Sequence, residues 1–331
     1  MCRLCASIFA IGLTLLNSCP AAANDSAAEL SIGGLRFTRS PDVEMVREDL
    51  KISLDRITVR YEFVNTSAAP VTLTVAFPLP DIDLSEGENI SFPSNDPLNF
   101  VDFETKVDGA PIKFKIDQRA FVGDKDVTAQ LGDLKIAMLP LGSQQFRPQD
   151  LPNAIRGKMV SDGLLIPAGS DERGRQLYAP GWIVKTAVVR EQTFQPGKTV
   201  VVEHSYRPSV GASADTILRK PLRQDKALVR EVERYRRDYC VSDEFLKELD
   251  KIAGASRNGT NIQERRISYI LKTGANWGRP IRHFHLSIEK DRGLATFCPG
   301  KLVPAATKAQ SFTATNFTPE QDIKFLFIGP F

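Results

Sequence analysis

Hydrophobic and polar residues alternate with a period of two along most of the chain after residue 35. This period is typical of β-strands that bury one face. In the segment 57–63, for example, Ile57, Val59 and Tyr61 would share one face. The same alternation runs through 71–77, after a short turn-forming segment rich in Asn, Ser, Thr, Ala and Pro. We therefore expect 57–63 and 71–77 to form a β-hairpin.

Two further strand pairs are predicted in the same way. The strands 100–107 and 112–116 flank Asp108-Gly109, a dipeptide suited to the positive φ angles of a tight turn. The strands 182–194 and 199–206 are joined by a short segment with Pro and Gly. Strand patterns return near the C-terminus, in 267–271, 281–288, 294–297, 311–317 and 323–328. This spacing favours an antiparallel β-sandwich.

Two stretches interrupt the strand pattern with helical signals. Short helices are expected between residues 126 and 160. The segment 225–237 is highly charged, and Ser242 can cap a helix that ends at Gly254. The expected fold class is mainly β, built from antiparallel β-sandwich units with a few inserted and connecting helices. The expected parts are a signal peptide (1–23), an N-terminal β-sandwich domain with a short helical insertion (24–215), a helical connector (216–256) and a C-terminal β unit (257–331).

The first 23 residues have the pattern of a secretory signal peptide. Arg3 is followed by an apolar run from Leu4 to Leu16 and by the small residues Ala21, Ala22 and Ala23, so we expect cleavage before Asn24 and export. An alternative is a lipoprotein signal, in which Cys19 would carry the lipid. The apolar run is shorter than the roughly 20 residues that cross a bilayer, and no later segment is apolar enough, so no transmembrane span is expected.

Charge and composition exclude one class of partner. The 331 residues include 43 Lys and Arg against 40 Asp and Glu, a formal net charge of +3, and removal of Arg3 with the signal peptide would leave +2. No sustained basic face stands out, so we do not expect nucleic acid as a partner. The composition is otherwise that of a globular protein with enough apolar residues to form a core.

Export and cleavage would change which cysteines remain and whether they can pair. Cys2, Cys5 and Cys19 belong to the signal region, which leaves Cys240 and Cys298 in the mature chain. Two cysteines in an oxidising compartment can form one disulfide, and the alternative is two separate buried thiols. Neither lies in a motif of a catalytic thiol.

Three histidines are the candidates for metal binding. His283 and His285 would share one face of a strand, and such a pair can hold zinc or copper if a third ligand, such as His204 or Glu203, lies close. Exposed or hydrogen-bonded histidines are the simpler interpretation, so we expect no cofactor. The predicted mature chain, residues 24–331, has no nucleophile elbow, phosphate-binding loop, His-Glu-x-x-His helix or Cys-x-x-Cys pair. Known catalytic motifs are therefore absent.

Several short segments occur together in a specific combination. They include Gly33-Gly34-Leu35, Ala76-Phe77-Pro78-Leu79-Pro80-Asp81-Ile82, Val202-Glu203-His204-Ser205-Tyr206-Arg207-Pro208, Tyr239-Cys240, Thr273-Gly274-Ala275-Asn276-Trp277 and Phe297-Cys298. With them the chain resembles, over nearly its whole mature length, an uncharacterised family of exported proteobacterial proteins called DUF4424. The family has no assigned activity, cofactor or catalytic residue. The resemblance implies a Gram-negative periplasmic setting and a bridge between Cys240 and Cys298, and His283 and His285 depart from its pattern.

These observations favour a non-catalytic binding or interaction module of the cell envelope, located in the periplasm. Its partner would be an envelope protein or a small apolar ligand. The alternative is a periplasmic hydrolase or metal-dependent enzyme with a site between the β units, so enzymatic activity stays open at this point. Two aromatic residues, Trp182 and Trp277, lie near Gly-containing turns and could be either core residues or recognition anchors.

Overall fold

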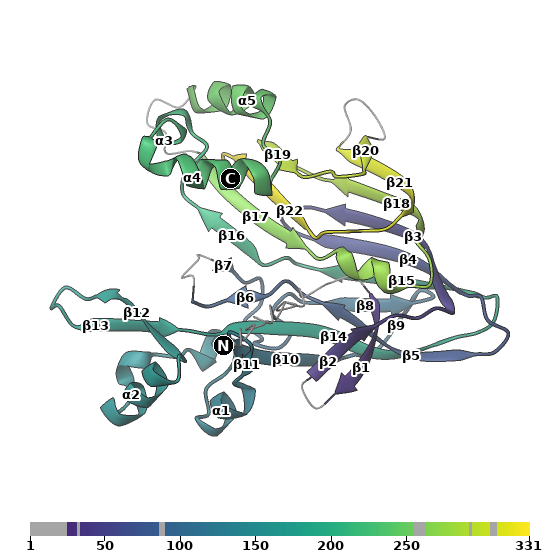
Figure 1. Cartoon of the computed structure of the whole chain (residues 1–331), viewed down its shortest axis with the longest axis horizontal. Helices are drawn as coiled ribbons and strands as arrows, with labels where there is room; N and C mark the ends of the chain where they lie inside the picture. Colours follow the sequence, from purple (N-terminus) through teal and green to yellow (C-terminus); the bar gives the residue numbers. More distant parts are fainter. Residues whose placement is uncertain (1–24, 32–33, 86–89, 255–261, 291–292, 305–309) are drawn as a thin grey trace, which may run out of the picture.

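One large sheet faces two smaller ones across a shared core (Figure 1). The computed structural model describes residues 25–31, 34–85, 90–254, 262–290, 293–304 and 310–331. Within these residues, strands far outnumber helices, which confirms the mainly β fold class. The predicted signal peptide and Cys19 lie outside the described residues.

The large sheet has eight strands and unites distant parts of the chain. In sheet order the strands are β20 (Val303–Pro304), β21 (Ser311–Phe317), β18 (Ile281–Ile288), β3 (Val43–Ile52), β4 (Ile57–Asn65), β15 (Thr199–Tyr206), β8 (Glu104–Val107) and β9 (Ala110–Pro111). Neighbouring strands are antiparallel, except that β18 runs parallel to β3. The domain boundaries drawn from the sequence stay predictions; the β18–β3 pairing places strands from both of the predicted β units in one sheet.

The two smaller sheets lie on the other side of the core. The seven-stranded sheet contains β11 (Lys125–Asp126), β10 (Lys115–Val122), β14 (Ile183–Phe194), β5 (Val71–Pro78), β1 (Ser26–Ser31) and β2 (Gly34–Thr38) in that order, with β6 (Ile82–Asp83) paired to β14. The five-stranded sheet contains β19 (Leu294–Phe297), β22 (Ile323–Gly329), β17 (Gln263–Tyr269), β16 (Val210–Ser213) and β7 (Ile90–Ser91). A separate hairpin joins β12 (Leu165–Ser170) and β13 (Gln176–Pro180).

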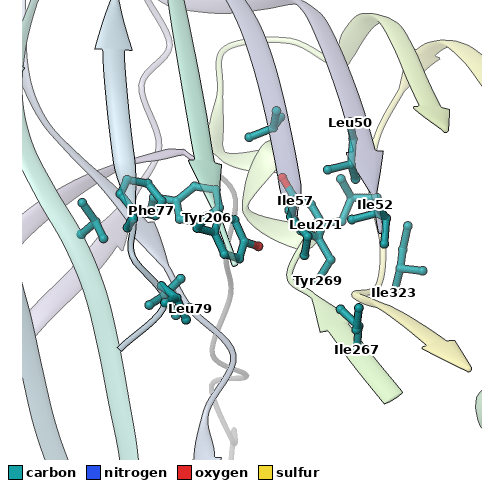
Figure 2. Close-up of a cluster of buried hydrophobic side chains, with 14 of the residues drawn as sticks. Leu50, Ile52, Ile57, Phe77, Leu79, Tyr206, Ile267, Tyr269, Leu271 and Ile323 are labelled. Atoms are coloured by element: carbon teal, nitrogen blue, oxygen red, sulfur yellow. The ribbon is translucent and has the colours of Figure 1, made fainter. Parts of the chain in front are cut away.

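Contacts between side chains show that the inner face of the eight-stranded sheet packs against both smaller sheets. Phe77 of β5 contacts His204 of β15, with ring centroids 5.0 Å apart. The hydroxyl oxygens of Tyr61 on β4 and Tyr269 on β17 lie 3.1 Å apart. Figure 2 shows Phe77 on one side of this core and Tyr269 on the other. Burial of these alternating apolar faces is the main force that holds the layers together.

Helices cover the outer faces of the smaller sheets in part. The helices are α1 (Thr128–Asp133), α2 (Asn153–Ser161), α3 (Lys220–Arg223), α4 (Val229–Asp238) and α5 (Asp243–Gly254), with short 3-10 turns η1 (Gly142–Gln144), η2 (Pro148–Asp150), η3 (Lys226–Leu228) and η4 (Lys272–Asn276). Val232 of α4 and Leu249 of α5 pack against Leu326 of β22. The predicted cap is confirmed, because the Phe245 N–H donates to Ser242 Oγ at 3.1 Å.

Two of the three predicted strand pairs are wrong, for one physical reason. The segments 57–63 and 71–77 form β4 and β5, and 182–194 and 199–206 form β14 and β15, but each pair is divided between two facing sheets. The connecting segments cross from one layer of the sandwich to the other, so neighbours in sequence do not pair. The turn at Asp108-Gly109 is confirmed, because it joins β8 to β9. The predicted partner strand 112–116 is wrong: β9 covers only Ala110–Pro111, and residues 115–116 belong to β10 in the seven-stranded sheet.

One buried residue holds both crossing connections. The Asn65 side-chain amide donates to the carbonyl oxygens of Ala69 at 2.8 Å and Phe194 at 2.9 Å. The Gly197 N–H donates to the Asn65 carbonyl at 2.9 Å. Asn65 therefore ties the β4–β5 connection to the β14–β15 connection.

A disulfide joins Cys240, just after α4, to Cys298, just after β19, with Cα atoms 4.8 Å apart. The bridge links the helical part of the chain to the five-stranded sheet, and it settles the choice between a bridge and two separate thiols. Among the described residues, no helix is both long and apolar enough to cross a membrane.

Candidate binding cleft

A cleft of about 350 Å³ lies where the eight-, seven- and five-stranded sheets approach helix α4. Apolar side chains that follow β5, begin β6 and β7, and precede β8 form one wall. Charged and tyrosine side chains from α4 and the residue after it, from β17 and from β22 line the other. The first group is Leu79, Ile82, Ile90, Phe100 and Val101, and the second is Arg234, Tyr235, Asp238, Tyr239, Arg266 and Lys324. The volume of this cleft lies within the range of small-molecule sites.

Tyr206 ends strand β15 and is part of the cleft lining. Alternation along β15 places its side chain on the inner face with His204, two residues earlier. Only 2% of Tyr206 is exposed. Its ring stacks on Phe103 and meets the Phe77 ring edge-on, both with centroids 5.8 Å apart. Figure 2 shows Tyr206 beside Phe77 in the core.

The Tyr206 hydroxyl has no hydrogen-bond partner within the part of the chain that the structure describes. The hydroxyl oxygen is not fully buried, because it borders the cleft. Water or a ligand in the cleft can therefore supply its hydrogen bond. Burial also raises the pKa of Tyr206 far above its usual value, so the hydroxyl keeps its proton. The cleft therefore contains a protonated donor that the surrounding protein does not satisfy.

The charged side chains around the cleft are paired with one another. Arg266 contacts the buried carboxylate of Glu264 and donates to Ser213 Oγ at 2.9 Å. Lys324 and Asp238 form an ion pair at 3.3 Å, and Arg234 contacts Glu231 within α4. These pairs leave no large excess of charge at the cleft.

Two further groups at the cleft have raised pKa values. Burial is the main cause for both, and it raises the pKa of Tyr235 to about 12. Burial also raises the pKa of Asp81, although nearby Lys185 partly opposes the change. The tyrosine is thus a neutral hydrogen-bonding group at neutral pH.

Backbone positions shape the polar wall. Gly211 of β16 lies under the Arg266 side chain, and a Cβ atom at this position would come within 3.2 Å of Arg266 Nε. The last turn of α4 is fixed to the five-stranded sheet, since Thr296 Oγ1 donates to the Tyr239 carbonyl at 2.9 Å and the disulfide follows at Cys240. The polar wall is therefore attached to the sheet at several points.

A separate buried charge cluster centres on Asp25. Asp25, fully buried, accepts hydrogen bonds from Arg190 Nη2 and His204 Nε2, each at 3.0 Å. Trp277 Nε1 donates to the Asp25 carbonyl at 2.7 Å. Asp25 is thus held by residues from β14, from β15 and from the segment between β17 and β18.

The electrostatics of this cluster follow from burial and pairing. Burial alone would raise the pKa of Asp25, but the charge of Arg190 and the hydrogen bonds from Arg190 and His204 outweigh it and hold that pKa well below the usual range. Burial lowers the pKa of His204, and Asp25 opposes this only in part. We therefore assign a neutral His204 that donates through Nε2, with Arg190 as the charged partner of Asp25.

Both tryptophans are core residues. Trp182 is fully buried and its Nε1 donates to the Met138 carbonyl at 2.8 Å. Trp277 is 3% exposed and packs against Phe63, with ring centroids 4.6 Å apart. The interpretation of these residues as recognition anchors is therefore wrong.

The candidate metal ligands do not meet. His204 faces the core, whereas His283 and His285 lie on the opposite, outer face of the eight-stranded sheet. His285 Nε2 lies 2.7 Å from Ser311 Oγ. Within the described residues, no group of three or more His, Cys, Asp or Glu side chains could hold a metal ion.

A second, shallower hollow of about 480 Å³ lies on that outer face and includes Glu203, Ser205 and His285 in its lining. His285 is on β18 and the other two are on β15, three strand spacings away in the sheet. At ~4.8 Å per spacing, they are about 14 Å apart. Glu203 and Ser205 are therefore too far from His285 for a shared metal ion or a nucleophile–base pair.

The sequence reasoning missed the cleft and the role of Tyr206. The only local sign was a tyrosine at the end of an alternating strand, just before Pro208. Nothing in the alternation distinguishes Tyr206 from an ordinary core residue, because its lining partners come from segments far away in the sequence.

Comparison with known proteins gives a family and a distant fold likeness. Among solved structures, a "putative nutrient binding protein" from Legionella pneumophila aligns with a TM-score of 0.39 and 14% identity, over 92% of this chain and 72% of that one. Likeness at this level says nothing about what this chain binds. No curated protein matches the sequence. The family model described as a domain of unknown function, DUF4424, matches residues 23–326. The chain therefore belongs to the DUF4424 family.

Proposed function

We propose that this protein is a non-catalytic binding module and that its cleft takes a small, partly apolar molecule. The observation that carries this proposal is the cleft itself, which combines an apolar wall, a polar wall and the unpaired hydroxyl of Tyr206. A ligand with an apolar body would remove the first wall from water, and each 100 Å² of apolar surface buried would contribute about 2.5 kcal/mol.

We further propose that the protein works after export, in the periplasm. The pattern of residues 1–23 supports export, and the Cys240–Cys298 disulfide is of the kind that persists in oxidising compartments. Cleavage before Asn24 and lipidation of Cys19 are the two processing routes, and the mass of the mature chain distinguishes them. The alternative function, a hydrolase or metal-dependent enzyme, gains no support from the positions of His204, His283 and His285.

The experiment is a titration with a neutral apolar fluorescent probe, N-phenyl-1-naphthylamine, whose emission rises in apolar surroundings. Ser268 is exposed on β17 at the cleft, so Ser268→Phe should fill the cleft without disturbing the core. The matched control is Ser287→Phe on the outer face of the eight-stranded sheet. We expect binding by the wild type and the control, and a loss of at least about tenfold in Ser268→Phe. Equal binding by all three proteins would contradict the proposal.

A further inference from the structure

We propose that the ligand carries a carbonyl or carboxylate oxygen that accepts a hydrogen bond from Tyr206. This inference rests on the proposed function, because it names the chemistry of the molecule that the cleft takes. It starts from Tyr206, a residue that is 2% exposed and lines the cleft, and whose hydroxyl makes no hydrogen bond to the described residues.

The proton on Tyr206 determines which kind of partner is missing. A phenolic hydroxyl has one hydrogen to donate and also oxygen lone pairs that can accept. The raised pKa of Tyr206 keeps that hydrogen in place at all physiological pH values. A ligand that only donates would leave the hydrogen without an acceptor, so full pairing requires an acceptor on the ligand.

The side chains that pack against the Tyr206 ring offer no acceptor for its hydroxyl hydrogen. Its ring is enclosed by Phe77 and Phe103, and neither side chain has a polar atom. The polar groups of the opposite wall are engaged elsewhere: Tyr235 donates to Glu264 at 3.0 Å, and Arg266 contacts the same carboxylate. The pairing of the wall charges also means that the acceptor need not be ionised.

The same arrangement sets the orientation of the ligand. The acceptor oxygen would lie next to Tyr206, and the apolar body would extend along Leu79, Ile82 and Val101. Ketones, esters, amides and carboxylic acids with an apolar body share this chemistry. A saturated hydrocarbon of the same size would fit the apolar wall and leave the hydroxyl unpaired.

The test compares two neutral probes of nearly equal size, 1-acetylnaphthalene, which has a carbonyl oxygen, and 1-ethylnaphthalene, which has none. We expect the wild type to bind the ketone at least about fivefold more tightly, the effect of one hydrogen bond. Tyr206→Phe should reduce that difference to less than about twofold while leaving the affinity for 1-ethylnaphthalene unchanged. Tyr178→Phe in the β12–β13 hairpin is the matched control and should keep the wild-type preference.

The outcomes separate this inference from the proposed function. If Ser268→Phe blocks both probes but Tyr206→Phe keeps the preference for the ketone, the cleft is a binding site and the role of Tyr206 is refuted. If neither probe binds the wild type, both proposals fail. A third probe, 1-naphthoate, distinguishes the two acceptor types: tighter binding than the ketone, lost in Tyr206→Phe, assigns a carboxylate.

Because Tyr206→Phe removes only an unpaired hydroxyl, we expect the variant to fold with undiminished stability. Thermal unfolding of the variant and the wild type checks this expectation.

Discussion

Asp25 lies at the start of the described chain. Its hydrogen-bond partners come from the seven-stranded sheet, from the eight-stranded sheet and from a segment that follows the five-stranded sheet. Arg190 comes from the seven-stranded sheet, His204 from the eight-stranded sheet, and Trp277 from the segment that leaves the five-stranded sheet. A buried ion pair of this kind contributes little net stability when intact, but removal of one partner leaves an uncompensated charge in the core. The position of a single carboxylate is therefore important for the assembly of the whole sandwich.

We expect Asp25→Asn to lower the free energy of unfolding by about 3–5 kcal/mol, because Arg190 would remain buried without its counter-charge. Urea unfolding measures the change. The control is Asp102→Asn, whose pair with Arg207 is about half exposed and should cost less than about 1 kcal/mol. Equal effects of the two substitutions would contradict the described role of Asp25.

His204 should make stability depend on pH. Its pKa in the folded protein lies below the usual 6.5 because of burial, so below that pH the unfolded chain binds more protons than the folded one. Stability is therefore complete above about pH 6.5 and falls as the pH drops toward the lowered folded pKa. The depressed pKa of Asp25 adds a further loss at more acidic pH, below its usual 3.8.

Unfolding free energies at about pH 7.5 and about pH 5.5 test this expectation. The wild type should be less stable at the lower pH, and His204→Gln should show a smaller difference between the two values. His285→Gln, on the outer face, should keep the wild-type difference. A wild type with the same stability at both pH values would show that His204 does not titrate as described.

At the scale of elements, helix α4 forms part of the polar wall of the cleft, and its C-terminal end is attached to the five-stranded sheet in three ways. These are the Cys240–Cys298 disulfide, the hydrogen bond from Thr296 to the Tyr239 carbonyl and the Lys324–Asp238 ion pair. The disulfide is the strongest of the three and lies two residues after Asp238. Its loss should therefore affect binding as well as stability.

We expect the double variant Cys240→Ser/Cys298→Ser to lose about 4 kcal/mol of stability, the chain-entropy value for a bridge that spans 58 residues. At a temperature where the variant is still folded, its affinity for N-phenyl-1-naphthylamine should also fall, because the end of α4 is less fixed. Unchanged affinity in the folded variant would mean that Thr296 and Lys324 position the wall without the bridge.

The positions of strands and helices could be predicted from the sequence because they depend on local patterns. Alternation located β4, β15 and β18, and the signals at Ser242 and Gly254 marked helix α5. Pairing could not be predicted in the same way. A short connection such as that after Asn65 suits both a hairpin and a crossing between layers, and the choice depends on contacts with Phe194, far away in the sequence.

At the scale of the whole molecule, the cleft exists only because several distant segments meet. Four residues of its lining come from different places: Leu79 directly follows β5 of the seven-stranded sheet, Tyr206 is in the eight-stranded sheet, Tyr235 is in α4 and Arg266 is in the five-stranded sheet. No local sequence motif marks such a site. A small apolar ligand could therefore be proposed from the sequence, but its binding site could not be located. The division into parts at residues 215 and 256 stays a prediction, and limited proteolysis of the folded chain would test it.

The most direct test of the proposed binding role is native mass spectrometry of the chain after export by a Gram-negative host. We expect a bound small molecule on the wild type and on Ser287→Phe, and a bare chain for Ser268→Phe, in which the cleft is filled. A wild type that never carries an added mass, and that also fails to bind the apolar probes, would show that this cleft is not a ligand site.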